Sequence, residues 1–316
     1  MKLYTKIWLE VLKNGSALRA LKKTRLRPLF STAKNYFWQL HQISKQNEGP
    51  TRHPTSIHLE ITTYCPRNCQ GCYVPQSERS DKRIMDVDTA REVMRIGRKN
   101  SIRIYNLIGG EPLTKQTVPL IRTLAKENKE FIFHICSNSY FLSERTDQTT
   151  QLIRLPNITI GMSVDGFQTT NDSIRGAGSF KRMEMAAEYL ASNRCFFGAL
   201  ITLREANKDE VLTPQFIDFL ISKGFLYAYF LVSDDSLIPH LDHLKQFGFE
   251  KPIFITNEIW GTLDATSKSN RPRTSYVNRD GKMLKQRCFG REMIGTIGLG
   301  LEAYANDTEW VDYYKD

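Results

Sequence analysis

The sequence predicts an α/β fold: a partial (β/α)6 barrel of the TIM type, with an N-terminal helical arm and an irregular C-terminal extension. Strand-like apolar runs alternate with helix-like segments six times between residues 57 and 232, which is typical of a parallel sheet covered by helices. Polar and glycine-rich motifs follow these runs, at the carboxyl ends of strands where parallel barrels hold their sites. A chain of 316 residues suits one such domain with appendages.

The expected elements follow from hydrophobic periodicity and turn residues. They divide the chain into a basic amphipathic helical segment at 1–50, the barrel at 51–238 and the extension at 239–316, with a linker at 47–56. The strands are expected at 57–62, 102–108, 131–137, 158–164, 196–203 and 227–232. The helices between them are expected at 86–99, 116–128, 145–154, 179–193 and 214–223.

The N-terminal segment carries most of the positive charge. Residues 1–50 contain ten lysines and arginines against two glutamates, while the whole chain has a net charge of +10. Ser16 is expected to cap the second helix, and Pro28 to interrupt the segment. Basic residues opposite Trp, Phe and Leu are typical of a helix on an anionic membrane surface, and an arm packed on the barrel is the equal alternative. Nucleic acid is disfavoured, because the aromatic residues fall on the apolar side and not among the charges.

The first strand runs into a loop with three cysteines. Cys65, Cys69 and Cys72 have the spacing C-x3-C-x2-C, and the residues between them favour a tight, irregular backbone. A structural zinc site requires four closed ligands. An iron–sulfur cubane held by only three thiolates keeps one iron open. No nearby Cys or His supplies a fourth ligand, so the spacing favours a [4Fe-4S] cluster, with a zinc knuckle as the alternative.

This spacing resembles that of the radical SAM superfamily, and the resemblance covers residues 55–235. It implies one [4Fe-4S] cluster on the three cysteines, whose open iron binds the amino and carboxylate groups of S-adenosylmethionine (SAM). Many members carry an aromatic residue just before the third cysteine, where this chain has Gly71.

The second strand ends in Gly109-Gly110-Glu111-Pro112, which matches the GGEP element of that superfamily. Two glycines let a backbone approach a ligand closely. A carboxylate beside them can accept hydrogen bonds from an ammonium group. The resemblance implies that this element contacts the amino group of the methionine moiety.

The third and fourth strands also end in motifs that resemble the superfamily. Ser137 and Asn138 occupy the place of a Thr-Asn-Gly or Ser-Asn-Gly element and are expected to face the cofactor, with Ser139 replacing the glycine. In the next motif, Ser163-Val164-Asp165-Gly166, Ser163 is expected to bind the ribose, while Asp165 either belongs to the site or caps the following turn. Arg175 is expected to meet the SAM carboxylate, which suits its planar fork.

The remaining candidates carry weaker signals. Thr202, near the end of the fifth strand, or Asn207, which follows it, is expected either to contact the adenosine or to stabilise a turn or helix cap. Cys136 is expected to be a buried strand residue. Asp234 and Asp235 either reach the substrate or form a solvated loop.

The C-terminal extension resembles the opening of a SPASM or twitch extension, which carries auxiliary clusters. After Cys288 there are no further cysteines, so one cluster in total is expected. A hairpin is expected at 293–307.

Composition and segment lengths indicate the compartment. Six cysteines in this length do not form a disulfide framework, which fits a reducing compartment. The start lacks the apolar core of a signal peptide, and no run reaches the roughly 18 apolar residues of a spanning helix. The expected location is the cytoplasm, with peripheral attachment to the inner face of the membrane if the arm binds lipid.

The resemblance implies an enzyme in which the reduced cluster cleaves SAM to methionine and a 5′-deoxyadenosyl radical that attacks an unactivated carbon. It also implies a flavodoxin- or ferredoxin-like electron donor. The basic arm favours a lipid or membrane-associated substrate. Peptide modification is the alternative, because the Cys288 region resembles extensions of peptide-maturing members. A second alternative is a non-catalytic, metal- or cluster-binding scaffold docked on a membrane.

Overall fold

One curved sheet of ten strands organises the chain. The computed structural model describes residues 13–46, 56–242, 244, 250–257, 274–277, 282–287 and 290–296. The strand order is β10-β9-β8-β1-β2-β3-β4-β5-β6-β7, and neighbours from β8 to β7 are parallel. The six expected strands form within two residues of their expected bounds: β1 (Ser56–Thr62), β2 (Ile104–Gly109), β3 (Ile132–Ser137), β4 (Ile158–Ser163), β5 (Phe197–Leu203) and β6 (Tyr227–Val232). The predicted partial barrel is confirmed.

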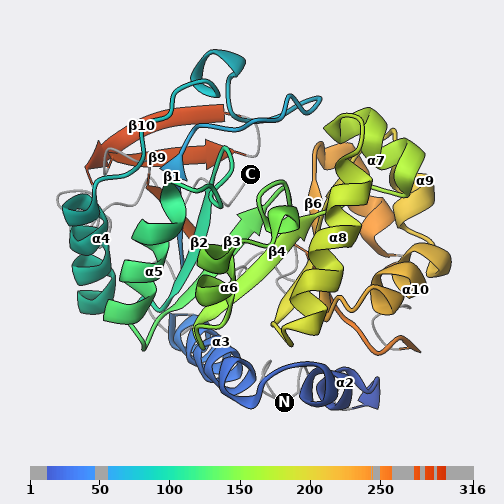
Figure 1. The fold of residues 1–316 in the computed structure, drawn as a ribbon, viewed down its shortest axis with the longest axis horizontal. Coiled ribbons are helices and arrows are strands. Elements are labelled where there is room, and N and C mark those ends of the chain that lie inside the picture. Colours follow the sequence, from blue (N-terminus) through green and yellow to red (C-terminus); the bar gives the residue numbers. More distant parts are fainter. Residues whose placement is uncertain are drawn as a thin grey trace.

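The helices between the strands cover the outside of the sheet (Figure 1). The five expected ones are α4 (Val87–Lys99), α5 (Thr117–Glu127), α6 (Asp147–Ile153), α8 (Ser179–Ser192) and α10 (Pro214–Ser222). Asp86 caps α4 by accepting hydrogen bonds from two backbone N–H groups. The sequence pattern did not indicate α7 (Gln168–Arg175), α9 (Lys208–Val211) or the 3-10 turns Gln76–Glu78, Leu142–Glu144 and Asp235–Asp242.

The two faces of the sheet differ in polarity, because successive side chains of a strand point to opposite faces. One row of paired residues is apolar and buried in the main core, namely Leu59, Leu107, Ile135 and Ile160. The neighbouring row is polar, namely His58, Asn106, His134 and Thr159. Within this row, His134 Nδ1 lies 2.9 Å from Thr159 Oγ1, and burial lowers the pKa of His134 to about 4. The face that carries His134 is therefore partly polar, with Ile108 also on it, unlike the apolar face under the helices.

The N-terminal arm, α2 (Ser16–Lys23) and α3 (Leu26–Gln46), lies across the amino ends of the strands (Figure 1). Arg19 donates to the carbonyl of Ile221 at 2.6 Å, and Arg25 donates to that of Ile153 at 2.6 Å. These contacts support the alternative of an arm packed on the barrel.

Two expectations for the arm were wrong. Gly15 holds the cap position of α2, and Asn14 Oδ1 accepts from the backbone N–H of Ser16, which is itself the first helical residue. Pro28 does not interrupt α3, because it lies in the first turn, where a missing N–H breaks no helical hydrogen bond.

The C-terminal part adds four strands to the same sheet. β7 (Phe254–Asn257) pairs with β6, and β8 (Thr274–Val277) pairs with β1 on the other side. β9 (Lys282–Arg287) and β10 (Gly290–Thr296) form an antiparallel hairpin, which begins earlier than expected. The expectations for Cys288 and for the linker fall outside the described residues. Among the described helices, none is both long and apolar enough to cross a bilayer.

Candidate functional site

The three cysteines of the loop after β1 are free and half-buried. The backbone of Cys65 donates to Arg79 at 3.0 Å, and that of Gln70 donates to Ile174 at 2.9 Å. The loop is thus held by backbone hydrogen bonds at its first cysteine and between its second and third. No set of three or more His, Cys, Asp or Glu side chains in the described part of the chain is arranged to hold a single metal ion.

The end of β2 packs directly against the backbone that leads into this loop. A Cβ added at Gly109, which has φ 126°, would lie 2.1 Å from the carbonyl oxygen of Thr62, and one at Gly110 would lie 2.2 Å from that of Tyr64. The N–H of Gly110 donates to Thr62 at 2.8 Å, and that of Glu111 donates to Tyr64 at 2.7 Å. The glycines are required for this close approach of two backbones.

The carboxylate of Glu111 is fully buried and joins the GGEP element to the end of β3. Its Oε1 accepts from Leu113 N at 2.9 Å and from Ser137 Oγ at 2.8 Å, and its Oε2 accepts from Asn138 N at 2.7 Å. Burial raises the pKa of Glu111 to about 7 against the opposing effect of these donors. The expected contact between this element, including the buried Pro112, and an ammonium group stays a prediction.

Asn138 connects β3 to the cysteine loop. Its Nδ2 lies 3.3 Å from Cys65 Sγ. Burial, followed by the nearby charge of Glu111, raises the pKa of the Cys65 thiol to about 12. Ser139, in the place of the expected glycine, has a left-handed φ of 67°. Sequence reasoning placed Ser137 and Asn138 at the site; the structure brings Asn138 into contact with the loop, while Ser137 binds Glu111.

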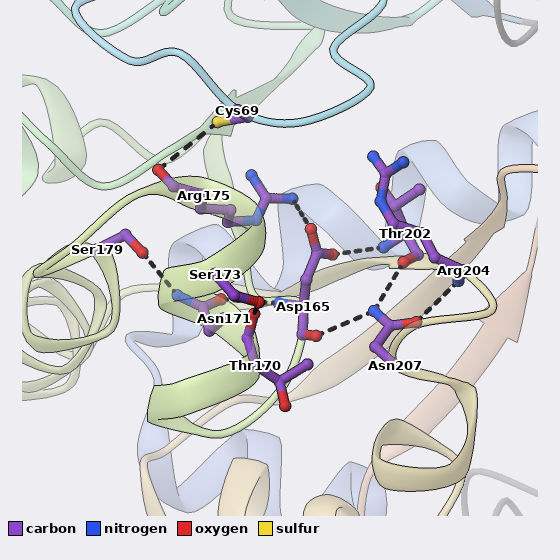
Figure 2. Close-up of polar contacts among 10 residues, drawn as sticks. All are labelled: Cys69, Asp165, Thr170, Asn171, Ser173, Arg175, Ser179, Thr202, Arg204 and Asn207. Atoms are coloured by element: carbon purple, nitrogen blue, oxygen red, sulfur yellow. Dashed lines mark hydrogen bonds and ion pairs between the residues drawn. The ribbon is translucent and has the colours of Figure 1, made fainter.

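Asp165 is the centre of a second network (Figure 2). Its Oδ1 accepts from Thr202 N at 2.8 Å, and its Oδ2 forms an ion pair with Arg175 Nη2 at 2.8 Å. Asn207 Nδ2 donates to the carbonyls of Asp165 and Thr202, at 2.9 and 3.0 Å. Asn207 thus links the ends of β4 and β5, and the contact expected between Thr202 or Asn207 and the adenosine stays a prediction.

Arg175 ends α7 next to the cysteine loop. Cys69 Sγ lies 3.9 Å from the carbonyl oxygen of Arg175. Burial raises the pKa of Cys69, and the positive charge of Arg175 opposes this effect. The contact expected between Arg175 and a SAM carboxylate stays a prediction.

Arg204 is a site residue that sequence reasoning missed. It follows β5 and extends, like Arg175, toward the loop that carries Cys69 (Figure 2). Its Nη1 lies 2.8 Å from the position of a Cβ at Gly71, where many superfamily members have an aromatic side chain. The signal that could have found it is a charged residue directly after a barrel strand.

Guanidinium nitrogens without partners mark the space beside the loop. Within the described residues, Arg67 Nε and Nη2, Arg175 Nε and Arg204 Nε are buried and lack a hydrogen-bond acceptor. Buried cationic donors are costly unless an anion or acceptor meets them. Three free thiols beside such donors fit an anionic iron–sulfur cluster and a carboxylate-bearing ligand.

The other candidates lie apart from these contacts. Ser163 is half-buried at the end of β4, and its expected contact with ribose stays a prediction. Cys136 lies within β3, where burial raises its pKa to about 12. Asp234 accepts from Ser236 N at 2.9 Å, which is a turn interaction.

Comparison with known proteins gives consistent results. The sequence model of the radical SAM superfamily matches residues 59–213. An uncharacterized protein of Archaeoglobus fulgidus is 26% identical over 169 residues, 53% of this chain and 39% of that protein. The sporulation killing factor maturation protein SkfB of Bacillus subtilis is 25% identical over 159 residues, 50% of this chain and 38% of that protein. The chain thus spans about two-fifths of the length of these curated relatives.

The fold is similar to that of SuiB from Streptococcus suis. The structure of SuiB bound to S-adenosylmethionine has a TM-score of 0.66 and 13% identity, over 90% of this chain and 73% of that one. The structure of SuiB bound to its precursor peptide SuiA has a TM-score of 0.64 and 13% identity, over 91% and 72%. At this identity the likeness concerns the fold.

Proposed function

The chain belongs to the radical SAM superfamily, and we propose that it is an enzyme that uses one [4Fe-4S] cluster and SAM to attack an unactivated carbon. The observation that carries this proposal is the set of three free thiols on a loop bordered by arginines with unpaired nitrogens. When bound, the cluster and SAM supply one-electron cleavage of SAM and a radical that abstracts hydrogen or adds to the substrate. A protein reductant, flavodoxin- or ferredoxin-like, is part of the proposal.

The roles of the residues follow from their positions. Cys65, Cys69 and Cys72 hold three irons and leave the fourth open. Arg175 and Arg204 supply positive charge and donors for the carboxylate and the electron-rich ligands beside the loop. Gly109 and Gly110 keep the end of β2 against the backbone that leads into the loop. Ser163 is the proposed ribose contact.

For the substrate we favour a peptide. Two relatives support this choice: SkfB is named as a maturation protein, and SuiB has been crystallised with a precursor peptide. The lipid substrate that the basic arm suggested gains no support from the relatives.

The reaction is tested with full-length protein reconstituted without oxygen. Iron and sulfide are measured on the reconstituted protein, and 5′-deoxyadenosine is measured after SAM and dithionite are added. We expect about four irons per chain, as for one cubane cluster, and loss of iron and product in the Cys65→Ala, Cys69→Ala, Cys72→Ala triple variant. Cys136→Ala, which removes a free thiol outside the loop, is the matched control and should keep both. Bound zinc without iron in the wild type, or product formed by the triple variant, rejects the proposal.

The substrate class is tested in the same assay by adding peptides or lipid vesicles. A peptide substrate predicts that short peptides raise 5′-deoxyadenosine formation and change in mass, whereas vesicles of bacterial phospholipid do neither. The reverse result would favour the lipid alternative. If 5′-deoxyadenosine forms without peptide or vesicles, the enzyme cleaves SAM without a substrate, and the proposed cleavage reaction still stands.

A second proposal concerns location: the arm docks on an anionic membrane surface, on the cytoplasmic side. Four of the six exposed large hydrophobic side chains in the described part belong to α2 and α3, namely Leu18, Leu21, Leu26 and Phe30. Exposed basic residues accompany them, namely Lys22, Lys23, Arg27 and Lys34. Outward apolar side chains among basic ones are typical of helices in an anionic lipid interface.

Flotation of the full chain with vesicles of phosphatidylglycerol and phosphatidylcholine tests the docking. We expect flotation with these vesicles but not with phosphatidylcholine alone, and its loss in Leu26→Ser, Phe30→Ser. The matched control is Ile84→Ser, Met185→Ser, which removes the two exposed hydrophobic side chains outside the arm. Equal flotation of the two double variants, or a shift to a dimer in place of vesicle binding, contradicts the docking.

A further inference from the structure

Asn138 makes a direct contact with a sulfur of the cysteine loop. Its side-chain nitrogen lies 3.3 Å from Cys65 Sγ, and the two residues are 73 positions apart in the sequence. This is the kind of contact that fixes the electronic properties of a metal centre, because ligand atoms respond to the donors around them.

The orientation of the amide is determined by its other end. Asn138 Oδ1 lies 2.9 Å from the backbone nitrogen of Tyr140. A backbone N–H can only donate, so the atom facing it must be the amide oxygen. The NH2 group therefore faces Cys65, and the contact is an N–H···S hydrogen bond.

The backbone of Asn138 is fixed by Glu111. Asn138 N donates to Oε2 of this buried carboxylate at 2.7 Å, and the N–H of Glu111 itself donates to Tyr64, the residue before Cys65. Ser137 Oγ donates to the other oxygen at 2.8 Å. Glu111 therefore connects the backbone of Asn138, which carries the donor, to the residue that precedes Cys65, which carries the acceptor sulfur.

From these contacts we propose that Asn138 raises the reduction potential of the cluster through its bond to Cys65, and that Glu111 is the residue that positions Asn138. The inference rests on the proposed function. An electron added to the cluster increases the negative charge on its sulfurs, so an N–H donor to a ligand sulfur stabilises the reduced state more than the oxidised one. Removing the donor makes the cluster harder to reduce.

The test is a potentiometric titration of reconstituted full-length protein, followed by electron paramagnetic resonance, with iron per chain measured in parallel. Asn138→Ala should lower the potential, with a roughly tenfold smaller equilibrium constant for reduction, which corresponds to 59 mV for a one-electron couple. Asn138→Asp has the same shape and still accepts from Tyr140, but it places oxygen against sulfur, so it should lower the potential further. Glu111→Gln also removes a negative charge near Cys65, which by itself raises the potential. A net fall in this variant therefore shows that the positioning of Asn138 is lost, and a net rise removes the positioning role of Glu111.

Asn157→Ala is the matched control, because Asn157 is an asparagine whose side chain likewise donates hydrogen bonds, here to the carbonyls of Ala125 and Asn128, away from the loop. It should leave the potential unchanged. Wild-type potential in an Asn138→Asp protein that retains its iron overturns the inference while the proposed function stands. Equal shifts in the Asn138→Ala and Asn157→Ala proteins overturn it as well. A wild type without iron and sulfide instead rejects the proposed function.

Discussion

At the level of single residues, Glu111 is expected to make stability depend on pH near neutrality. Its pKa is about 7 in the fold and 4.5 in the reference state, so the folded chain keeps a proton that the unfolded chain has released. The stabilisation is fully present below about pH 4.5 and is lost as the pH rises through about 7. Chemical denaturation should therefore give a larger free energy of unfolding at about pH 6 than at about pH 8.5.

Glu111→Gln should flatten this dependence, since glutamine does not titrate. Glu92→Gln is the control: Glu92 is exposed, and its hydrogen bond with Arg95 lowers its pKa, so it stays ionised over the same range. If the Glu111→Gln protein keeps the wild-type slope between the two pH values, Glu111 is not its source.

Ser139 is a second residue in an unfavourable environment, because its backbone is left-handed and its hydroxyl is buried. It has φ 67° and is buried, and its hydroxyl has no partner among the described residues. A left-handed backbone costs roughly 1–2 kcal/mol for a residue with a Cβ. Ser139→Gly should raise the free energy of unfolding by about 1 kcal/mol, after the entropy cost of glycine.

Ser101→Gly is the matched control for this change, because Ser101 has φ 60° but is exposed. It relieves the same backbone strain without removing a buried hydroxyl, so its gain should be smaller. The measurement is the free energy of unfolding of both variants from denaturant curves whose slopes equal that of the wild type. A Ser139→Gly protein no more stable than wild type would mean that the hydroxyl has a role in the site.

At the level of elements, the contact between the end of β2 and the cysteine loop should be necessary for the cluster. Gly110→Ala places a Cβ 2.2 Å from the carbonyl oxygen of Tyr64, and a backbone atom cannot yield without displacing the loop. Iron content after reconstitution should fall well below that of the wild type. Gly178→Ala, at φ 73° with no atom within 4 Å of the new Cβ, should cost about 1 kcal/mol of stability but keep its iron. Equal iron in the two variants would show that the loop tolerates displacement.

Local pattern predicted the elements well and their contacts poorly. The strands and the three cysteines depend on neighbours in the sequence, so periodicity and spacing are enough to place them. The pairing of Asp165 with Arg175, or of Asn138 with Cys65, depends on which strand ends meet in space. Short α7 was missed because eight residues without an apolar stripe give no helical period, although it carries Arg175.

At the level of the whole molecule, the arm shows that periodicity gives the faces of a helix but not which face is inside. Apolar periodicity alone would place Leu18 and Leu21 on the inward side of α2, and the structure exposes both. Arg19 and Arg25 point inward instead, to carbonyls at or near the C-terminal ends of α10 and α6. Cationic donors are favourable there, because the last carbonyls of a helix have no partner within it.

This arrangement predicts that Arg25 attaches the arm to the barrel. Arg25 donates to the carbonyls of Ile153 and Arg154, at 2.6 and 3.1 Å, and hydrogen bonds from a charged group contribute about 1.5–3 kcal/mol each. Arg25→Met keeps the length of the side chain but not its donors, so backbone amides of α2 and α3 should exchange hydrogen for deuterium faster. Arg27→Met, at an exposed position in the first turn of α3, should exchange as the wild type does. Unchanged exchange in the Arg25→Met protein would mean that apolar contacts alone hold the arm at the amino ends of the strands.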